Sequence, residues 1–152
     1  MKLSTKGRYA VMALYDLARE AQTCQENKAV SLQDIALRQN LSLSYLEQLF
    51  ARMRRAGLVE SLRGAQGGYV LGQDPKSITV SMIMRAANES FKSTRCSSTA
   101  QSGCMNKGAT CATHHLWAGL EQTVDSYLNS VTLADLLQKD TVLRACGVVH
   151  GH

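Results

Sequence analysis

The strongest constraint on the fold is a pair of helix-like apolar patterns separated by a very short polar turn. Ser31 is a hydroxyl cap with an acid three residues on, and it starts a helix that we expect to reach about Arg38. Gln39-Asn40-Leu41 forms the turn, and Ser42 caps a second helix that ends at Gly57. Two helices joined in this way predict a helix-turn-helix.

A glycine-rich hairpin follows this motif. Residues 58–62 and 69–71 are strand-like, and the segment between them, 63–68, holds three glycines and is typical of a turn. An apolar helical pattern over residues 5–22 comes before the motif. We therefore expect a mainly α fold, with a winged helix-turn-helix DNA-binding domain at residues 1–75 and a long helix after it.

The second half of the chain is organised differently. A short helix is expected at about 80–88, and a stretch of polar sequence with no period follows it. A long amphipathic helix is predicted at about 113–130, with a short helix at 133–139. We divide this half into a connecting helix at 76–91, a loop at 92–114, the long and short helices at 113–140 and a tail at 141–152.

Composition narrows the class of protein. The chain has 152 residues, 45% apolar and 19% charged, which suits one globular domain with an appendage. Its charge of +5 weakly favours a polyanionic partner. No apolar run reaches the roughly 18–20 residues that cross a bilayer, and the first residues lack the apolar core of a secretion signal. Five cysteines without such a signal favour a reducing compartment. We expect a cytoplasmic protein with no membrane partner.

Several polar residues are candidate DNA contacts. The second helix of the motif carries, opposite its apolar stripe, side chains that bond base edges or phosphates. The first helix has a basic start that would meet phosphate at its positive end. An arginine lies in the hairpin loop, where it would enter a minor groove. Taken singly, each is more often a solvated surface residue, and it is the whole arrangement that favours DNA binding. The candidates are Lys6, Arg8, Tyr9, Ser42, Ser44, Tyr45, Glu47, Gln48, Arg52, Arg55 and Arg63.

Glu47 is the one acid among these candidates. A carboxylate repels phosphate, yet it accepts a hydrogen bond from the amino group of cytosine. We therefore hypothesise that Glu47 restricts which DNA sequences bind. The alternative is a weak surface pair between Glu47 and a nearby arginine.

Three cysteines lie in the polar stretch, and an imidazole follows the last of them. Cys96, Cys104 and Cys111 are separated by seven and six residues, and His114 stands three residues after Cys111. Three thiolates and an imidazole make a four-ligand set, which suits zinc or an iron–sulfur centre, and the ligand count does not separate the two. The alternative is three inert cysteines, which belong in packed cores rather than polar loops. His115 is a rival ligand that points about 100° away on a helix.

Four blocks of sequence resemble a family of bacterial winged-helix regulators, and among them the iron–sulfur cluster regulators. The blocks are Leu3 to Ala10, Leu43 to Phe50, Arg63-Gly64 with Gly67-Gly68-Tyr69, and Cys111-Ala112-Thr113-His114. The resemblance implies a homodimer that binds double-stranded promoter DNA. It also implies one [2Fe-2S] cluster per subunit and control of iron–sulfur assembly genes. The gaps between the cysteines are longer than this family leads one to expect.

The resemblance also assigns roles to particular residues. It implies cluster ligation by Cys96, Cys104, Cys111 and His114, and DNA contact by the Ser42–Gln48 segment and the Arg63 hairpin. It makes the long helix a dimerisation helix that pairs with its twin, although a helix packed within one subunit has the same periodicity. The residues of its apolar stripe that would lie in the dimer interface are Leu116, Leu120, Val124 and Tyr127.

Other classes of function are weighed against this one. No nucleophile–base pair, phosphate loop or pair of carboxylates stands out, so we expect the chain not to be an enzyme. A small iron–sulfur electron carrier is a second hypothesis, and it needs no basic DNA-reading face. A nearer alternative keeps DNA binding but changes the ligand, as in a nitric-oxide-sensing regulator or a zinc-stabilised repressor.

Overall fold

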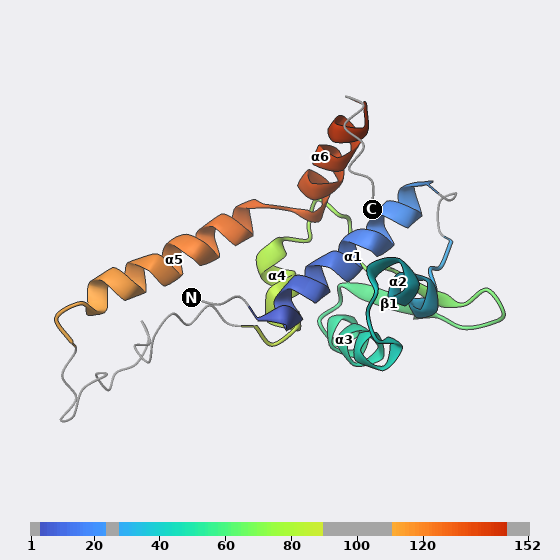
Figure 1. Ribbon diagram of the computed structural model, residues 1–152, viewed down its shortest axis with the longest axis horizontal. Helices are drawn as coiled ribbons and strands as arrows, with labels where there is room; N and C mark the ends of the chain where they lie inside the picture. Colours follow the sequence, from blue (N-terminus) through green and yellow to red (C-terminus); the bar gives the residue numbers. More distant parts are fainter. Residues whose placement is uncertain (1–3, 24–27, 90–110, 146–152) are drawn as a thin grey trace.

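The structure is a computed structural model that describes residues 4–23, 28–89 and 111–145. It is mainly helical with one two-stranded antiparallel sheet, which confirms the expected fold class (Figure 1). The last helix continues six residues beyond Lys139, where the sequence pattern had placed its end. The elements in order are α1 (Thr5–Thr23), α2 (Leu32–Gln39), α3 (Leu43–Arg55), β1 (Val59–Leu62), β2 (Gly68–Leu71), α4 (Val80–Ala86), α5 (His114–Ser130) and α6 (Leu133–Ala145).

The helix-turn-helix forms through the caps that the sequence predicts. The side chain of Ser31 accepts a hydrogen bond of 3.2 Å from the backbone N–H of Asp34 at the start of α2. The side chain of Ser42 accepts one of 3.4 Å from the N–H of Tyr45 at the start of α3. Between the helices Asn40 is left-handed, with φ of 52°, a conformation that asparagine tolerates better than most residues. The turn that sets the two helices against each other is thus built from local hydrogen bonds.

The wing is a hairpin of β1 and β2 with a third segment alongside it. Val59 pairs with Leu71 at one end and Leu62 with Gly68 at the other. Val30, before α2, forms an isolated bridge to Tyr69 through two hydrogen bonds of 2.9 Å. A Cβ on Gly68 would lie 2.4 Å from the carbonyl oxygen of Val30, so only glycine lets the two backbones approach this closely. The wing is therefore tied to the start of the helix-turn-helix.

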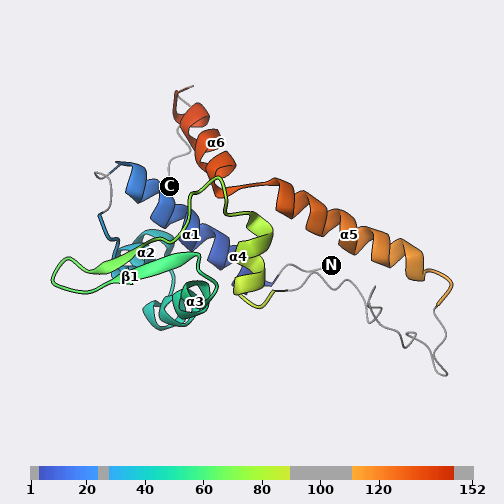
Figure 2. The same ribbon diagram turned by 180° about the vertical axis from the view of Figure 1, so that it is seen from behind.

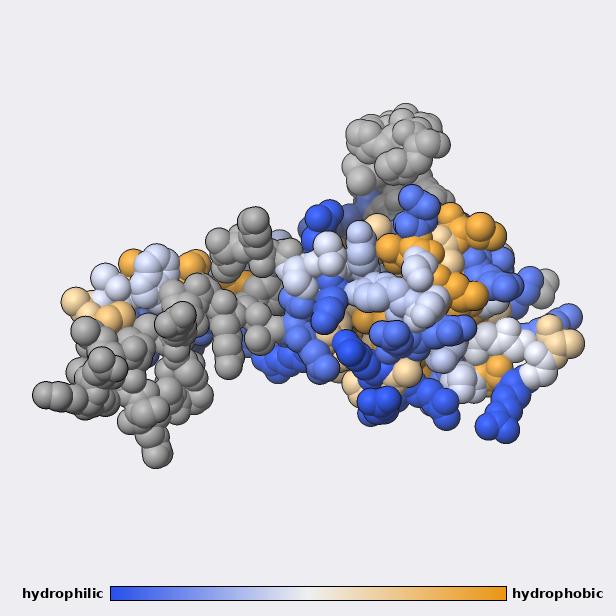
Figure 3. Space-filling view, turned by 60° about the horizontal axis from the view of Figure 1, so that its bottom comes forward, coloured by the Kyte–Doolittle hydropathy of each residue, from blue (hydrophilic) through white to orange (hydrophobic). Residues whose placement is uncertain are grey.

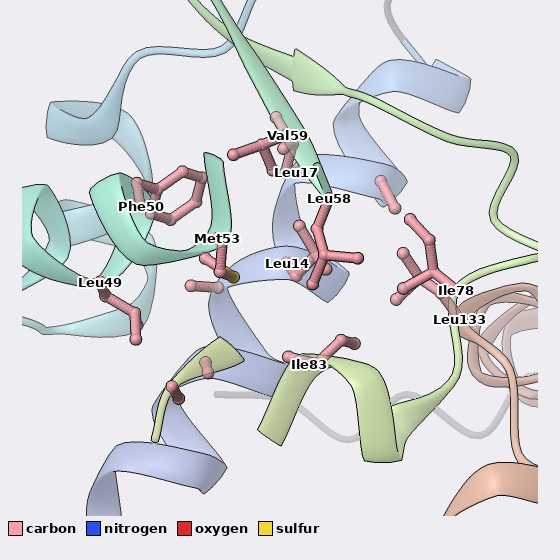
Figure 4. Packing of buried hydrophobic residues seen from close by; sticks show 14 of the residues in the cluster. Leu14, Leu17, Leu49, Phe50, Met53, Leu58, Val59, Ile78, Ile83 and Leu133 are labelled. Atoms are coloured by element: carbon pink, nitrogen blue, oxygen red, sulfur yellow. The ribbon is translucent and has the colours of Figure 1, made fainter. Parts of the chain in front are cut away.

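One apolar core holds α1, α3, α4, α6 and the base of the wing together (Figure 4). This core includes Leu14 and Leu17 of α1 together with Phe50 and Met53 of α3, and all four side chains are buried. The Phe50 ring meets Tyr69 edge-on at 5.0 Å between centroids, which connects α3 to β2. Residues from the later part of the chain close the core: Leu58, Val59, Ile78, Ile83, Leu133 and Leu137.

The helix α5 extends away from this body, as both ribbon views show (Figures 1 and 2). Within this fully described helix no residue is buried. Leu116 and Tyr127 are 63% and 64% exposed, although both belong to its apolar stripe. The apolar stripe that predicted α5 is therefore only partly covered by the described residues of its own subunit.

A polar junction fixes α5 to α4. The Asp125 carboxylate accepts 2.9 Å hydrogen bonds from the buried Ser81 hydroxyl and from Arg85, whose Nη2 reaches both oxygens. The Asn129 amide adds one of 3.2 Å. The hydrogen bond from Ser81, together with the Arg85 guanidinium, lowers the pKa of Asp125 below its usual range. Two backbone hydrogen bonds, from Val80 to Val131 and from Leu133 to Ile78, continue the junction.

Among the described helices, none combines the length and the apolar character needed to cross a membrane.

We predict that Gly68→Ala destabilises the protein by about 1–3 kcal/mol, because the new methyl group overlaps the Val30 backbone. The free energy of unfolding in urea measures this. Gly119→Ala is the control, since nothing lies within 4 Å of the Cβ position on α5, and it should leave stability equal or slightly higher. Equal effects of the two substitutions would contradict the proposed close approach at Gly68.

We predict that Asp125→Asn weakens folding more at pH 7 than at pH 3. The folded-state pKa of Asp125 is lowered, so its stabilisation is present above the unfolded pKa of about 4 and disappears as the pH falls through the folded value. The carboxylate is partly exposed, so we expect less than about 1 kcal/mol. Urea unfolding of both proteins at the two pH values measures the difference, and a difference that persists unchanged at pH 3 would refute this role for the charge.

Candidate DNA-binding surface and metal ligands

The exposed face of α3 carries most of the predicted DNA contacts. Burial of Leu46, Leu49 and Phe50 against the core turns the opposite face of the helix to solvent. Figure 3, which brings the α3 side of Figure 1 forward, shows mostly hydrophilic side chains over the lower part of the body. Arg52 is half-buried. The fully exposed candidates are Ser42, Ser44, Glu47, Gln48 and Arg55.

Both ends of α3 favour a negatively charged ligand. Ser42 caps the N-terminus of α3, where the backbone amides favour an anion. The last turn carries Arg52, Arg54 and Arg55, which interact favourably with the negative end of the helix. A polyanion laid along α3 would therefore meet a favourable partner at each end. Arg54 was not among the residues singled out from the sequence, because it does not share the spacing of the others.

Tyr45 occupies a different environment from its neighbours on α3. Its ring is half-buried, and it meets Tyr9 of α1 in an edge-on contact with 6.0 Å between centroids. Its hydroxyl is buried and has no hydrogen-bond partner within the described ranges. Burial raises the pKa of this hydroxyl, and Tyr9 and Glu89 add to the rise while Arg52 opposes it. Tyr9 and Tyr45 therefore join the starts of α1 and α3.

The other basic candidates lie on two further elements. Lys6 and Arg8 are exposed in the first turns of α1, beside the Tyr9–Tyr45 contact. Arg63 is exposed directly after β1, in a hairpin that projects from the body (Figure 2). The start of α1, the face of α3 and the wing are each anchored to the one core, so their spacing is fixed by folding.

An ion pair between a buried aspartate of α1 and an exposed arginine of α2 supports the helix-turn-helix. Asp16 of α1 is fully buried, and it accepts hydrogen bonds of 3.0, 3.1 and 2.6 Å from Arg38 and one of 2.8 Å from Gln39. The bond to Asp16 raises the pKa of Arg38 further above its usual value. This network fixes the end of α2 to α1. The sequence contained a signal for it, an acid within the apolar stripe between Leu14 and Leu17.

The C-terminal half of the predicted ligand set lies at the start of α5. The N–H of His114 donates to the Cys111 carbonyl at 3.1 Å, so one turn of chain brings the two residues together. The Nδ1 atom of His114 is buried and lacks a hydrogen-bond partner among residues that the structure describes. The Cys111 sulfur lies 3.8 Å from the Thr113 hydroxyl. A ring nitrogen without a partner, in a turn that also carries a cysteine, suits a soft metal ion or an iron–sulfur centre.

Electrostatics at this turn also suit anionic ligands. Thr113 stands at the N-cap of α5 without capping it, since its hydroxyl instead accepts a 3.1 Å hydrogen bond from the Trp117 indole. The first amides of α5 are thus left without a side-chain cap, and they favour thiolates nearby. Cys96 and Cys104 lie outside the described residues. Within the described ranges no group of three or more metal-ligating side chains comes together.

The predicted interface residues divide in their exposure. Leu116 and Tyr127 are exposed on α5, whereas Leu120 and Val124 are half-buried. The two sets follow one stripe of α5, so the helix presents apolar surface along its length. His115, the rival ligand, is exposed and meets His114 edge-on, with ring centroids 5.7 Å apart.

A capped helix-turn-helix, a hairpin wing and a polar face on the second helix of the motif define a winged helix-turn-helix transcription regulator. Residues 3–139 match the Rrf2 family, described as an iron-dependent transcriptional regulator, and the chain belongs to that family. It is therefore a regulator and not an enzyme, as the sequence predicted.

Three similar proteins set the chain within the family. The transcriptional regulator IscR of Klebsiella pneumoniae is 45% identical over 152 residues, which is 100% of this chain and 89% of the relative. The structure of T. potens IscR superposes with a TM-score of 0.73 at 40% identity, covering 92% of this chain and 88% of that one. The structure of CymR, the global cysteine regulator of B. subtilis, gives 0.72 at 37% identity, covering 91% and 98%. The resemblance to iron–sulfur cluster regulators found in the sequence is thereby confirmed.

Proposed function

We propose that this chain is a cytoplasmic transcription regulator, without a membrane partner, that senses the status of a [2Fe-2S] cluster and controls genes of iron–sulfur cluster assembly. The observation that carries the proposal is the turn at the start of α5, which holds Cys111 and, three residues on, a buried His114 Nδ1 that has no partner among the described side chains. The chain thus offers a nitrogen and a sulfur ligand in a protein whose family binds DNA.

Recognition of double-stranded promoter DNA is assigned to three surfaces. The exposed side chains of α3, led by Ser42, Ser44 and Gln48, would enter the major groove and bond base edges. Lys6 and Arg8 at the start of α1 would hold phosphates, and Arg63 of the wing would reach a minor groove. Tyr45 and Tyr9 contribute by fixing α1 against α3, because the Tyr45 hydroxyl is buried. Arg52 and Arg55 complete the basic end of α3.

The cluster would be held by Cys96, Cys104, Cys111 and His114, one cluster in each subunit. When bound, such a centre supplies one-electron redox chemistry and a change of charge. Imidazole in place of a thiolate removes one negative charge, which raises the reduction potential, as in other histidine-ligated centres. His114 binds only when unprotonated, so cluster assembly is expected to weaken in acid. These properties suit a sensor better than a structural staple.

Dimerisation is proposed through α5. The helix has no buried residue within one subunit, and its apolar stripe, Leu116, Leu120, Val124 and Tyr127, would pair with its twin. A C2 arrangement presents two winged domains to two half-sites of DNA. The ligands at the start of α5 would then lie on the same element as the interface.

A second candidate function keeps DNA binding and changes the ligand. The similar structure CymR is named a global cysteine regulator, so its name refers to cysteine and not to an iron–sulfur cluster. A zinc-stabilised or nitric-oxide-sensing repressor would use the same thiols. An electron carrier is disfavoured, since it needs no exposed polar face on α3.

We predict that the protein, reconstituted anaerobically with iron and sulfide, becomes coloured and binds two iron and two sulfide per subunit. Cys111→Ser and Cys104→Ser should each lose most of the visible absorbance, because one ligand of four is removed. Visible spectra with iron and sulfide assays measure this. His115→Ala is the matched control and should keep the wild-type spectrum. A colourless wild-type protein that binds zinc would overturn the cluster, and a coloured Cys111→Ser protein would overturn the ligand assignment.

We predict two different kinds of effect for two substitutions on the proposed DNA-binding surface. Arg63→Ala should weaken binding to all duplexes and reduce the slope of affinity against salt by about one, as loss of one phosphate-type contact does. Glu47→Ala should instead change the preference between duplexes. Binding is measured on a duplex selected from a random pool by the wild-type protein and on a scrambled duplex of equal composition. An unchanged ratio between these two duplexes in Glu47→Ala would exclude a role in specificity.

A further inference from the structure

Glu89 lies where α4 meets the start of α1. Its Oε1 accepts a hydrogen bond from the Ser4 hydroxyl, although the two residues are 85 positions apart in the chain. Ser4 directly precedes α1, and its hydroxyl also accepts a 3.3 Å hydrogen bond from the N–H of Lys6. The carboxylate of Glu89 therefore sits at the positive end of α1, where a negative charge is favourable.

The backbone and its packing hold Glu89 in this position. Asn88 is left-handed, with φ of 60°, and the N–H of Glu89 donates to the Met84 carbonyl at 2.9 Å, so the chain turns back sharply after α4. The Glu89 side chain crosses α1 at Gly7, where an added Cβ would lie 3.0 Å from its Cγ and 2.5 Å from the Met84 Cε. A side chain at Gly7 would displace one or both of them. The contact between Glu89 and α1 is thus close-packed as well as hydrogen-bonded.

Glu89 also acts on the start of α3. Its charge contributes to the raised pKa of Tyr45, after burial and alongside Tyr9. Tyr45 is the third residue of α3, and Tyr9 is in the second turn of α1. The two DNA-facing helices therefore begin next to each other with one carboxylate close to both. Among the salt bridges between described residues, none involves Glu89, so a surface lysine or arginine does not neutralise it there.

We propose that Glu89 is a positioning residue that couples the cysteine-bearing segment to the first turn of α1 and the start of α3. The inference rests on the proposed function, because it takes the thiols as cluster ligands. After Glu89 the chain continues directly towards Cys96 and Cys104. A displacement of Glu89 along the chain must break or shift its bond to Ser4, and with it the turn that carries Lys6 and Arg8. The same displacement changes the electrostatic potential at Tyr45. The first turn of α1 and the start of α3 therefore respond together.

The test compares Glu89→Gln with Glu20→Gln. The first keeps the size of the side chain and an acceptor for Ser4 but removes the charge. The second removes an equal charge near the other end of α1, where Glu20 lies 3.8 Å from Arg19. For each protein we measure the dissociation constant of the selected duplex with and without reconstituted cluster. The readout is the ratio of these two constants, with the visible absorbance per subunit recorded alongside.

We expect Glu89→Gln to keep the wild-type absorbance, while the ratio of its two dissociation constants moves towards one by about five-fold or more, the lower end of typical coupling. Ser4→Ala should move the ratio in the same direction, and Glu20→Gln should keep it. Circular dichroism melting checks folding, and Ser4→Ala decides the matter if Glu89→Gln does not fold.

Two results would overturn the coupling. Fully coloured Glu89→Gln and Ser4→Ala proteins with the wild-type ratio would show that Glu89 is only a packing residue. Loss of colour in Glu89→Gln would show that it acts on cluster assembly instead. By contrast, a wild-type protein that is colourless, or whose own ratio is one, would overturn the sensing part of the proposed function, and the coupling would fall with it.

Discussion

The apolar core that gathers the buried stripes of α1, α3 and α4 is the interaction on which the remaining structure depends. Phe50 and Met53 of α3 lie in one buried cluster with Leu14 and Leu17 of α1, and each such side chain contributes about 1.5–3 kcal/mol through burial. Because the residues between the buried positions of a helix lie on its opposite face, burial of one stripe determines which residues face outward. The polar face of α3 is therefore a consequence of the core, and it needs no further interaction to point it at a ligand.

Polar contacts then fix the angles that the core leaves open. The Asp16–Arg38–Gln39 network ties α2 to α1, and the junction around Asp125 ties α5 to α4. A buried carboxylate is costly unless it is hydrogen-bonded, so these partners have to be in place when the chain folds. Asp16 is fully satisfied and buried, whereas Asp125 is partly exposed. The Asp16 network thus fixes the helix-turn-helix, and the Asp125 junction fixes the direction in which α5 projects from the body.

Much of this arrangement could be predicted from the sequence, and the reasons differ from element to element. The capping serines and the glycine-rich hairpin are local signals, because each capping hydrogen bond joins residues three apart and the hairpin pairs residues six to twelve apart. The end of α6 was missed, since residues after Lys139 continue the helix without a clear apolar period. Tyr45 shares the spacing of the DNA-facing residues on α3, yet its hydroxyl is buried by contacts with α1. Contacts between distant segments, such as Ser4 with Glu89, leave no periodic trace and required the fold.

The helix α5, which projects from the body and has no fully buried residue, acts as a lever. It is anchored near Asp125 and carries His114 at its free end, eleven residues away, or about 16 Å at the usual rise per residue. A rotation of about 10° at the anchor would sweep that end through about 3 Å, more than the length of a metal–ligand bond. The stiffness of a few hydrogen bonds between α4 and α5 would therefore set how well the imidazole is held relative to the thiols of the proposed ligand set.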